Sequence, residues 1–393
     1  MMELPAGFVN EMQRLLPPDE YERFVASMDM PCPVSIRLNR RKISAEIMAD
    51  LDTHLHLNTD EQVAWCADGY YLPERPVFTL DPLLHAGAYY VQEASSMFVA
   101  HLINIYIGTR PVRALDLCAA PGGKSTLLES CLPLGSMLTC NEVVAKRARI
   151  LQENMTKWGG ANVQVTSHEA RAFAQMGAEY DFILCDVPCS GEGMMRKDDE
   201  ARTQWTDELV DMCSRRQRDI VADIWPCLTP GGIMIYSTCT YNTRENEENV
   251  AWIASELGAD ILPVDAKTEW NIMGNLLPHA SFPCAHFMPH RVRGEGFFCA
   301  VLRKKGEAAI AQPKHVGREK RNEVHSASVP PLVTVDRTTA LHYLHGDAIR
   351  LAADAPRGIV TIAYCGLPLG QAKNIGTRAN NLYPKEWRIR LDV

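Results

Sequence analysis

Residues 115–125 read Leu-Asp-Leu-Cys-Ala-Ala-Pro-Gly-Gly-Lys-Ser, an apolar run that passes through a glycine pair into a polar segment. This order predicts a strand, a tight loop and the start of a helix. Gly122 and Gly123 let the backbone approach a ligand closely, and the helix start behind them offers free N–H groups. The phosphate-loop pattern GxxxxGK[ST] is not met, because Cys118 stands where its first glycine is required, so ATP binding is disfavoured.

Further apolar runs follow this unit at helix-length intervals. Together with 113–118, the strand-like runs are 136–141, 163–167, 181–186 and 233–238. Strands that alternate with helices predict parallel β-α-β units and a doubly wound α/β sheet. A later run at 296–302 is suited to an added antiparallel strand.

The segments on either side of this sheet differ from it in composition. Residues 1–85 carry a helical pattern, then a basic stretch and several prolines, which predicts a small N-terminal α+β domain. Residues 306–330 are rich in charged residues, Ser and Pro and are interpreted as a linker. Short apolar runs with turn residues over 331–393 predict a β-rich module, which leaves 86–305 for the central domain.

The charge is unevenly distributed along the chain. The 40 Lys and Arg against 48 Asp and Glu give a net −8, which by itself argues against a polyanionic partner. However, residues 303–393 hold 15 basic and 8 acidic side chains, whereas residues 1–302 hold 25 and 40. A basic tail on an acidic body indicates nucleic-acid contact.

Two classes of protein are disfavoured by the remaining composition. No run approaches the ~18 apolar residues of a membrane span, and the first residues lack a basic end and an apolar core, so a cytoplasmic protein without membrane contact is expected. The 13 cysteines include no CxxC pair, so neither a zinc site nor a disulfide framework is expected, and no metal is predicted. Most of the thiols are expected to be buried and inert.

Two cysteines differ from the others because each follows a predicted strand. Cys189 comes three residues after Asp186, and Cys239 directly follows the strand that ends at residue 238. Ligands of open α/β sheets lie at these strand ends. A thiolate that adds to C6 of cytosine makes C5 nucleophilic toward a methyl donor, so covalent catalysis gives such a pair a purpose. Lys124 is a candidate source of the positive charge that a thiolate needs.

Four motifs carry a resemblance to a known family. The sequences YVQEASSM (90–97), CAAPGGKS (118–125), DVPCSGEGMMRKD (186–198) and STCTYNTRENEENV (237–250) resemble the Sun-type (nucleolar-protein/Fmu) RNA cytosine-5 methyltransferases, and within them the RsmF-like bacterial rRNA branch. The tail from 366 to 385 resembles the PUA-like RNA-binding module of that branch. The resemblance implies a Rossmann-like class I methyltransferase sheet, S-adenosyl-L-methionine as cofactor, and a monomer that acts on ribosomal RNA or the small ribosomal subunit.

The resemblance also implies roles for individual residues. Cys239 would be the nucleophile, and Cys189 would assist release of the methylated base. DNA-type enzymes carry their nucleophile in a PCQ motif, whereas Ser190 follows Cys189 here. Asp186 would lie between cofactor and cytosine, and Lys124 would also orient the base.

The cofactor contacts implied in the same way come from three strand ends. Glu142, which also stands where dinucleotide-type folds hold a ribose, would bind the ribose. Glu169 would contact the adenine, although it lies in the sequence HEAR where the family usually shows an Asp in a DGR-like context. The complete expected set is Cys118, Ala119, Ala120, Pro121, Gly122, Gly123, Lys124, Glu142, Glu169 and Asp186.

Basic residues in two stretches are the expected RNA contacts. The first stretch holds four cations in six residues, which forms a local positive patch. The second follows the Cys189 loop, where cations can grip phosphate. These candidates are Arg37, Arg40, Arg41, Lys42, Arg196 and Lys197.

The leading hypothesis is methylation of C5 of a cytosine in ribosomal RNA, 16S rRNA near the decoding site above all, through a covalent Cys–C6 intermediate. One alternative is the same reaction on another RNA such as tRNA. Methylation of an exocyclic amine or a glutamine is disfavoured, because such enzymes use an [ND]PP[YF] loop where this chain has Asp-Val-Pro-Cys at 186–189. A non-catalytic RNA-binding ribosome assembly factor is the remaining alternative, and intact Cys189, Cys239, Asp186 and Lys124 argue against it.

Overall fold

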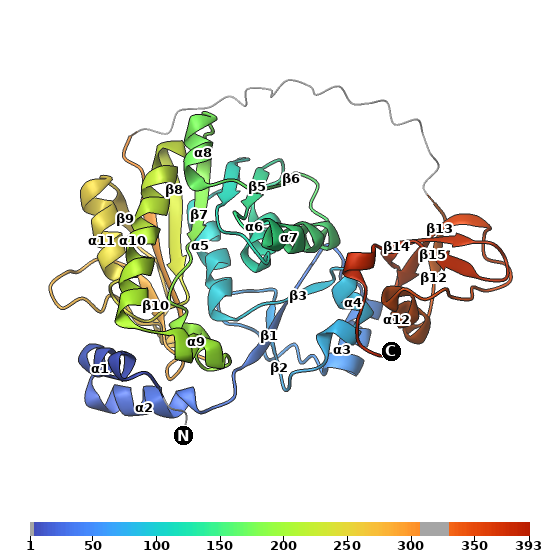
Figure 1. Cartoon of the computed structure of the whole chain (residues 1–393), viewed down its shortest axis with the longest axis horizontal. Coiled ribbons are helices and arrows are strands. Elements are labelled where there is room, and N and C mark those ends of the chain that lie inside the picture. Colours follow the sequence, from blue (N-terminus) through green and yellow to red (C-terminus); the bar gives the residue numbers. More distant parts are fainter. Residues whose placement is uncertain (1–3, 307–329) are drawn as a thin grey trace.

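A computed structural model describes residues 4–306 and 330–393, so the predicted linker at 306–330 lies outside the described residues except at its two ends (Figure 1). The central sheet has the order β10-β11-β8-β7-β4-β5-β6, with β9 paired to β11. Its strands are β4 (Arg113–Asp116), β5 (Met137–Asn141), β6 (Val163–Thr166), β7 (Tyr180–Asp186), β8 (Leu228–Thr238), β9 (Asp260–Leu262), β10 (Ala285–Phe287) and β11 (Phe297–Arg303).

The predicted strand pattern of this sheet is confirmed. The five strands β8, β7, β4, β5 and β6 pair in parallel with their neighbours, and β11 pairs antiparallel with β8, as the run at 296–302 suggested. The fold is therefore the expected Rossmann-like α/β sheet.

Helices cover both faces of the sheet because successive side chains of a strand point to opposite faces. In β4, Ala114 packs in the cluster that contains Leu127 of α6 (Gly123–Cys131), whereas Leu115 packs in the cluster that contains Val221 of α10 (Asp207–Ile224). Figure 1 shows these two helix layers on either side of the sheet. The other helices of this domain are α5 (Phe98–Tyr106), α7 (Ala145–Trp158), α8 (Ala170–Gln175), α9 (Asp199–Gln204) and α11 (Glu247–Glu256).

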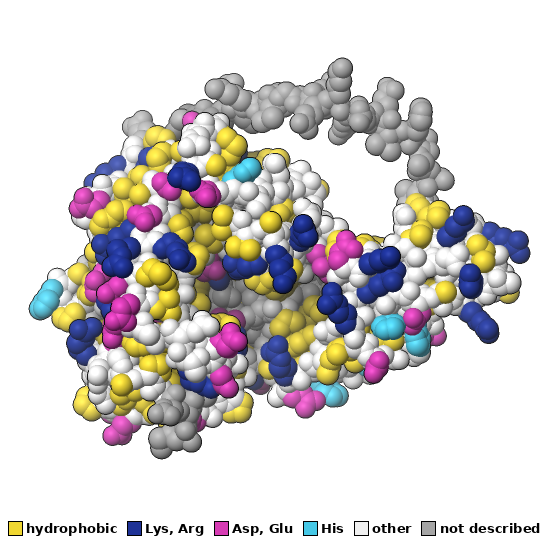
Figure 2. Space-filling model, viewed as in Figure 1, with side chains coloured by type: hydrophobic (Ala, Val, Ile, Leu, Met, Phe, Trp, Pro, Cys, Tyr) yellow, Lys and Arg dark blue, Asp and Glu magenta, His cyan; other side chains and the backbone are white. Residues whose placement is uncertain are grey.

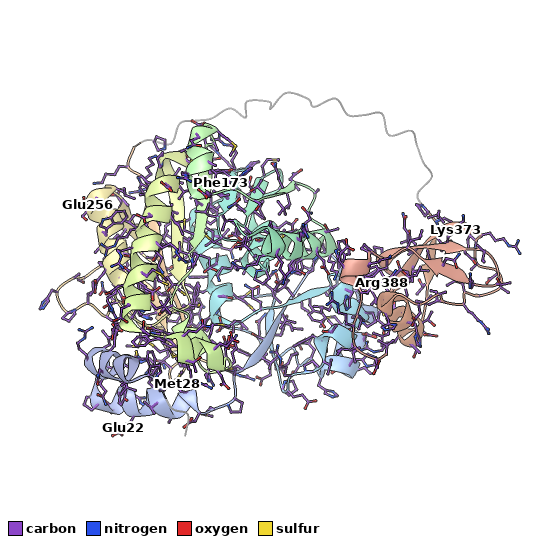
Figure 3. All side chains as sticks on the ribbon, viewed as in Figure 1. Glu22, Met28, Phe173, Glu256, Lys373 and Arg388 are labelled. Carbon is purple, nitrogen blue, oxygen red and sulfur yellow. The ribbon has the colours of Figure 1, made fainter. Side chains whose placement is uncertain are left out.

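The first two helices, α1 (Ala6–Leu15) and α2 (Pro18–Met28), pack against the central domain. Phe8 and Phe24 form one buried cluster with Trp205 and Tyr241, and the Phe24 and Tyr241 rings meet edge to face with centroids 5.2 Å apart. Met28, labelled in Figure 3, belongs to the same cluster. These helices are thus separate from the sheet that follows them in sequence.

That sheet is small and antiparallel, with the order β2-β1-β3. It consists of β1 (Val34–Leu38), β2 (Gly69–Leu72) and β3 (Tyr89–Val91), accompanied by α3 (Ala45–Leu55) and α4 (Pro82–His85). Because β3 pairs with β1, the sheet continues past residue 85, where the N-terminal domain was expected to end.

The C-terminal module is β-rich, as predicted, and its sheet has the order β12-β13-β14-β15. Its elements are β12 (Leu332–Thr334), α12 (Arg337–His345), β13 (Gly358–Tyr364), β14 (Leu367–Asn374) and β15 (Ala379–Asn381). Tyr343 and Leu344 of α12 share one buried cluster with Leu51 of α3 and Leu83 of α4, so the module packs on the N-terminal sheet and its helices.

Short 3-10 turns connect several of these elements. They are η1 (Phe78–Leu80), η2 (Ser95–Met97), η3 (Glu192–Met194), η4 (Trp225–Cys227), η5 (Thr268–Trp270) and η6 (Lys385–Trp387). Within residues 4–306 and 330–393, no helix has both the length and the apolar character needed to cross a membrane.

The surface carries charges of both signs. Figure 2 shows Lys and Arg side chains along the C-terminal module and on the neighbouring part of the body, with acidic side chains interspersed. Lys373 lies on β14, and Arg388 lies just after η6, on the side of the module nearer α7; both are labelled in Figure 3.

Candidate active site

A cavity of about 310 Å³ opens where the carboxyl ends of the central strands meet. The ends of β4, β7 and β8 come together here because these strands are neighbours in the sheet. Further lining comes from residues 90–93, at the end of β3 and just after it, and from residues 295–297, at the start of β11. The lining side chains include Tyr90, Glu93, Asp116, Cys118, Lys124, Asp186, Cys239, Glu295 and Phe297.

Cys189 and Cys239 lie side by side at this edge, with their sulfur atoms 3.3 Å apart. Strands β7 and β8 bring them together, since Asp186 and Ser237 pair in register just before the two cysteines. Both thiols are half-buried, and Cys239 lines the cavity. The hydrogen bond to Cys239, together with burial, holds the pKa of Cys189 well above its ordinary value. Cys189 is therefore a protonated thiol that can donate a hydrogen bond to the neighbouring sulfur.

A charged pair lies next to the cysteines. Lys124 Nζ donates a hydrogen bond to Asp186 Oδ2 at 2.8 Å, and Ser237 Oγ donates to Asp186 Oδ1 at 2.8 Å. Burial opposes the charge on Lys124, but the Asp186 carboxylate and, more weakly, Cys239 raise the pKa of this ammonium above its ordinary value. The site thus keeps a cation and the Cys239 thiol in the same cavity.

Asp116, at the end of β4, has a carboxylate oxygen without a partner. Oδ2 accepts a hydrogen bond from Ser125 Oγ at 2.6 Å, whereas the buried Oδ1 has no hydrogen-bond partner among the residues that the structure describes. Burial raises the pKa of Asp116 to about 7. Since an unsatisfied buried acceptor costs free energy, and Asp116 lines the cavity, a cationic donor in the cavity would be stabilised there.

The structure brings most of the expected cofactor residues together. Cys118, Ala119, Ala120, Pro121, Gly123, Lys124 and Asp186 all line the cavity. Gly122 lies among them at the start of α6 with φ of +118°, a conformation that favours glycine. We refer to residues 118–124 as the 118–124 loop.

Besides Gly122, two expected cofactor residues, Glu142 and Glu169, do not line the cavity. Glu142 is 2% exposed, and its carboxylate accepts a hydrogen bond from Val144 N and lies 2.9 Å from Arg147 Nη1. Glu169 is exposed and pairs with Arg171 at 2.6 Å. Their roles therefore stay predictions.

Sequence reasoning missed two residues that shape the 118–124 loop. Asn141 Nδ2 donates to Leu117 O and to His168 O, so one side chain joins the ends of β4, β5 and β6. Arg147 Nη2 donates to Ala120 O at 2.8 Å and thereby fixes the middle of the loop. An Asn at a strand end and a basic residue in the next helix are common, so neither gives a distinctive signal in the sequence.

The prediction that Arg37 contacts RNA is wrong. This side chain is 2% exposed and bonds inside the protein: Nε donates to Gln92 Oε1 at 2.8 Å and Nη2 to Thr126 Oγ1 at 2.6 Å. Its guanidinium also stacks 4.5 Å from the centre of the Trp158 ring. Arg37 therefore joins β1 to α6 and α7.

The other predicted RNA residues have different surroundings. Lys42 and Arg196 use their donors on backbone carbonyls, Ala86 O for the first and Met30 O, Pro31 O and Gly294 O for the second. Arg40, Arg41 and Lys197 are exposed, although each pairs with an acid: Asp68, Glu129 and Glu295 respectively. Only the last three stay well placed for RNA contact.

Comparisons with known families agree on one group. The central region, residues 110–303, matches the family described as 16S rRNA methyltransferase RsmB/F. Residues 4–94 match the N-terminal domain of 16S rRNA methyltransferase RsmF, and residues 330–389 match the methyltransferase RsmF PUA domain.

Curated relatives carry the name ribosomal RNA small subunit methyltransferase F. The protein of Pectobacterium carotovorum subsp. carotovorum is 33% identical, over 86% of this chain and 71% of its own length. That of Cronobacter sakazakii is 28% identical over 98% and 96%. The protein of Erwinia tasmaniensis is 35% identical over 76% of this chain, and the chain spans only 63% of that relative.

Solved structures support the fold. A methyltransferase homolog from Pyrococcus horikoshii superimposes with a TM-score of 0.62 at 25% identity, covering 77% of this chain and 100% of that one. The structure of PH0851 gives a TM-score of 0.67 at 24% identity, over 77% of this chain and 66% of the other.

Proposed function

The chain belongs to the 16S rRNA methyltransferase RsmB/F family, and we propose that it transfers a methyl group from S-adenosyl-L-methionine to C5 of a cytosine in ribosomal RNA. The substrate we infer is 16S rRNA near the decoding site. The observation that carries the proposal is the 3.3 Å separation of Cys189 and Cys239 beside Lys124. Two free thiols at one strand edge suit a reaction that needs a sulfur nucleophile and a second group to help release it.

The cavity fits the proposed cofactor. The unpaired Oδ1 of Asp116 suits a cationic group, which S-adenosyl-L-methionine carries in its amino and sulfonium groups. The 118–124 loop lines the cavity at residues 118–121, 123 and 124, where a ligand can lie close to the backbone. Residues 118–124 and Asp186 would hold the cofactor, with Glu142 at its ribose and Glu169 at its adenine. When bound, it supplies an electrophilic methyl group.

The cysteines supply the covalent chemistry. The Cys239 thiolate, favoured by Lys124, adds to C6 of the cytosine, and the electron pair moves so that C5 becomes nucleophilic. After C5 has been methylated, a base takes the C5 proton, the electron pair returns to the ring, and Cys239 leaves as a thiolate. Cys189, protonated and 3.3 Å away, is placed to assist that release. Asp186, held by Lys124 and Ser237, would lie between cofactor and base.

The target base must leave its stack, because sulfur attacks C6 from above the ring plane. We propose that the segments 1–85 and 331–393 bind RNA around the central domain, 86–305, which the PUA match supports for the last segment. Exposed Arg40, Arg41 and Lys197 are the phosphate contacts we retain. Binding is then expected to weaken as salt concentration rises.

The mechanism is tested by two cysteine variants incubated with RNA and labelled cofactor. Cys239→Ala is expected to abolish methyl transfer, whereas Cys189→Ala is expected to accumulate a protein–RNA adduct that survives a denaturing gel. Cys365→Ala, which changes a half-buried thiol of the C-terminal module, is the matched control and is expected to behave like the wild type. Full activity in Cys239→Ala would refute the nucleophile.

The substrate is tested separately, by bisulfite sequencing of RNA from cells with and without the gene. One 16S rRNA cytosine that loses its protection in the deletion strain is the expected result. A change confined to tRNA would favour the alternative substrate. No change in any RNA, together with an inactive purified protein, would favour the non-catalytic assembly factor.

A further inference from the structure

Glu192 is a fully buried carboxylate that accepts five hydrogen bonds from protein donors. It lies in η3, two residues after Ser190 and 0% exposed. Oε2 accepts from Thr240 Oγ1, from Tyr241 N at 2.7 Å and from Asn242 N at 3.0 Å. Oε1 accepts from Trp205 Nε1 at 2.9 Å and from Asn242 Nδ2 at 3.0 Å.

Both carboxyl oxygens of Glu192 serve as acceptors in this set of hydrogen bonds. A glutamine amide would point its NH2 group at either the Oε1 donors or the Oε2 donors, so at least two of the five bonds would be lost. Among the residues that the structure describes, no Lys or Arg forms an ion pair with Glu192. Its carboxyl group is therefore held by hydrogen bonds alone, as a buried polar group without an ion pair requires.

Four of these five donors belong to the segment that follows Cys239, and the fifth is Trp205 Nε1. The backbone N–H groups of Tyr241 and Asn242 and the hydroxyl of Thr240 all converge on one oxygen. In addition, η3 donates a hydrogen bond to the cysteine segment: Gly193 N, next to Glu192, donates to Cys239 O at 2.8 Å. The backbone around Cys239 is thus fixed to η3 from both sides.

The same network reaches the Cys189 segment. Asn242 Nδ2 is shared between Glu192 and Glu245 Oε1, at 3.0 and 2.8 Å. Glu245 Oε2 in turn accepts from Ser190 N at 3.0 Å, directly after Cys189. Two buried carboxylates and one amide therefore join the loops that carry the two sulfur atoms.

We propose that Glu192 is a positioning residue that sets the separation of Cys189 and Cys239. It touches neither sulfur and acts through residues 240–242 and through Asn242 to Glu245. This inference rests on the proposed function, in which the two thiols act on one base in succession. A misplacement of about 1 Å can cost a reaction about a hundredfold in rate, so a fixed separation would be required for turnover.

The first test measures the separation of the sulfur atoms without RNA. Diamide takes two hydrogen atoms from a pair of nearby thiols and leaves a disulfide, and peptide mass mapping identifies the Cys189–Cys239 bond among the other cysteines. In the wild type this bond is expected to form readily. In Glu192→Gln its rate is expected to fall about tenfold, because at least two hydrogen bonds that fix the loop are lost. An unchanged rate would overturn the inference.

The matched control is Glu247→Gln, which also replaces a fully buried carboxyl group by an amide. Glu247 accepts from Leu276 N at 3.0 Å and pairs with His286 at 3.2 Å, so its partners lie outside the two cysteine loops. Its disulfide rate is expected to match the wild type. Glu192→Asp is the second variant if Glu192→Gln does not fold, since it keeps the charge but cannot reach both sets of donors; it too is expected to be slowed.

The second test measures methyl transfer at saturating cofactor. Glu192→Gln is expected to lose about a hundredfold in kcat with KM for RNA nearly unchanged, whereas a merely destabilised variant would recover activity at low temperature. A change in KM for RNA with kcat unchanged would overturn the positioning role. If the wild type transfers no methyl group to any RNA, the proposed function fails, and the diamide rates still decide whether Glu192 holds the two thiols together.

Discussion

Replacing Arg37 by alanine separates the internal role of this side chain from the RNA contact that a basic stretch suggests. Within residues 4–306 and 330–393, no carboxylate pairs with its buried guanidinium, which bonds to Gln92 and Thr126, with Trp158 beneath it. Desolvation lowers the pKa of Arg37 below its ordinary value. Arg37→Ala removes this cation and leaves a cavity between β1 and α6.

The cost can be estimated from these contacts. Hydrogen bonds to a charged group contribute about 1.5–3 kcal/mol each, and a desolvated cation–π contact contributes about 2 kcal/mol. Against this, the variant no longer keeps a charge out of water, which returns several kcal/mol. Thr126 Oγ1 keeps its hydrogen bond to Gly123 O at 3.0 Å, whereas Gln92 Oε1 loses its bond and only Gln92 Nε2 keeps one, to Ser96 Oγ at 3.3 Å. We expect a net loss of about 3 kcal/mol in the free energy of unfolding.

The assay compares urea unfolding and RNA binding for Arg37→Ala and Arg41→Ala. Arg41 is the matched control, because its side chain is 51% exposed and pairs with Glu129 at the surface, so its loss should cost less than about 1 kcal/mol. Arg41→Ala should instead weaken RNA binding and reduce the salt slope by about one. The reasoning is refuted if Arg37→Ala unfolds like the wild type and shows the reduced salt slope itself.

Three further predictions concern the active site and the C-terminal module. Burial raises the pKa of Asp116 from 3.8 to about 7, so between these pH values the folded protein binds a proton that the unfolded chain has lost. The free energy of unfolding should therefore fall as pH rises through that window, by up to about 1.4 kcal/mol per pH unit. Asp116→Asn should flatten this pH dependence when the free energy is measured by urea unfolding. Lys124→Met should slow alkylation of Cys239 by iodoacetamide at neutral pH about tenfold. An unchanged rate would show that Lys124 does not activate Cys239. Arg337→Ala deletes a 3.3 Å contact with Asp81 and a 2.9 Å hydrogen bond to Leu80 O. Amide hydrogen exchange should therefore become faster in β3 and α4, while the amides of the central sheet keep their protection. Equal acceleration in both regions would contradict a local role of Arg337.

The cysteine pair was predictable from sequence for a simple geometric reason. Cys189 and Cys239 each follow a run of apolar residues, and parallel strands end at the same edge of a sheet. Neighbouring strands then place whatever follows them side by side. No comparable rule links Glu192 to residues 240–242, because η3 and the segment after β8 meet only in the folded chain. Buried polar networks of this kind depend on tertiary contacts that a local pattern does not encode.

Arg37 belongs to a basic stretch of sequence, but its side chain is buried in the fold and is not part of a positive surface patch. A basic stretch at 37–42 predicts a positive surface patch, but its first member lies within β1. Ser35, Arg37 and Asn39 alternate with Ile36 and Leu38, and all five are buried. Alternation with period two is the signal of a strand with two distinct faces. Here the polar face is also covered, which only the packing of β1 against α6 and α7 reveals.

The two faces of β1 change how the C-terminal module should be tested. Ile36 on the apolar face shares one buried cluster with Tyr343 and Ile362 of the module, while Arg37 on the polar face bonds to Thr126 of α6, directly behind the 118–124 loop. Removing residues 331–393 would expose apolar surface on the N-terminal sheet, at about 25 cal/mol for each Å². Lost activity in a truncated chain would then report damage to the sheet that supports the loop as much as lost RNA contacts. Point changes on the exposed face of the module, such as at Lys373, separate the two effects because they leave that cluster intact.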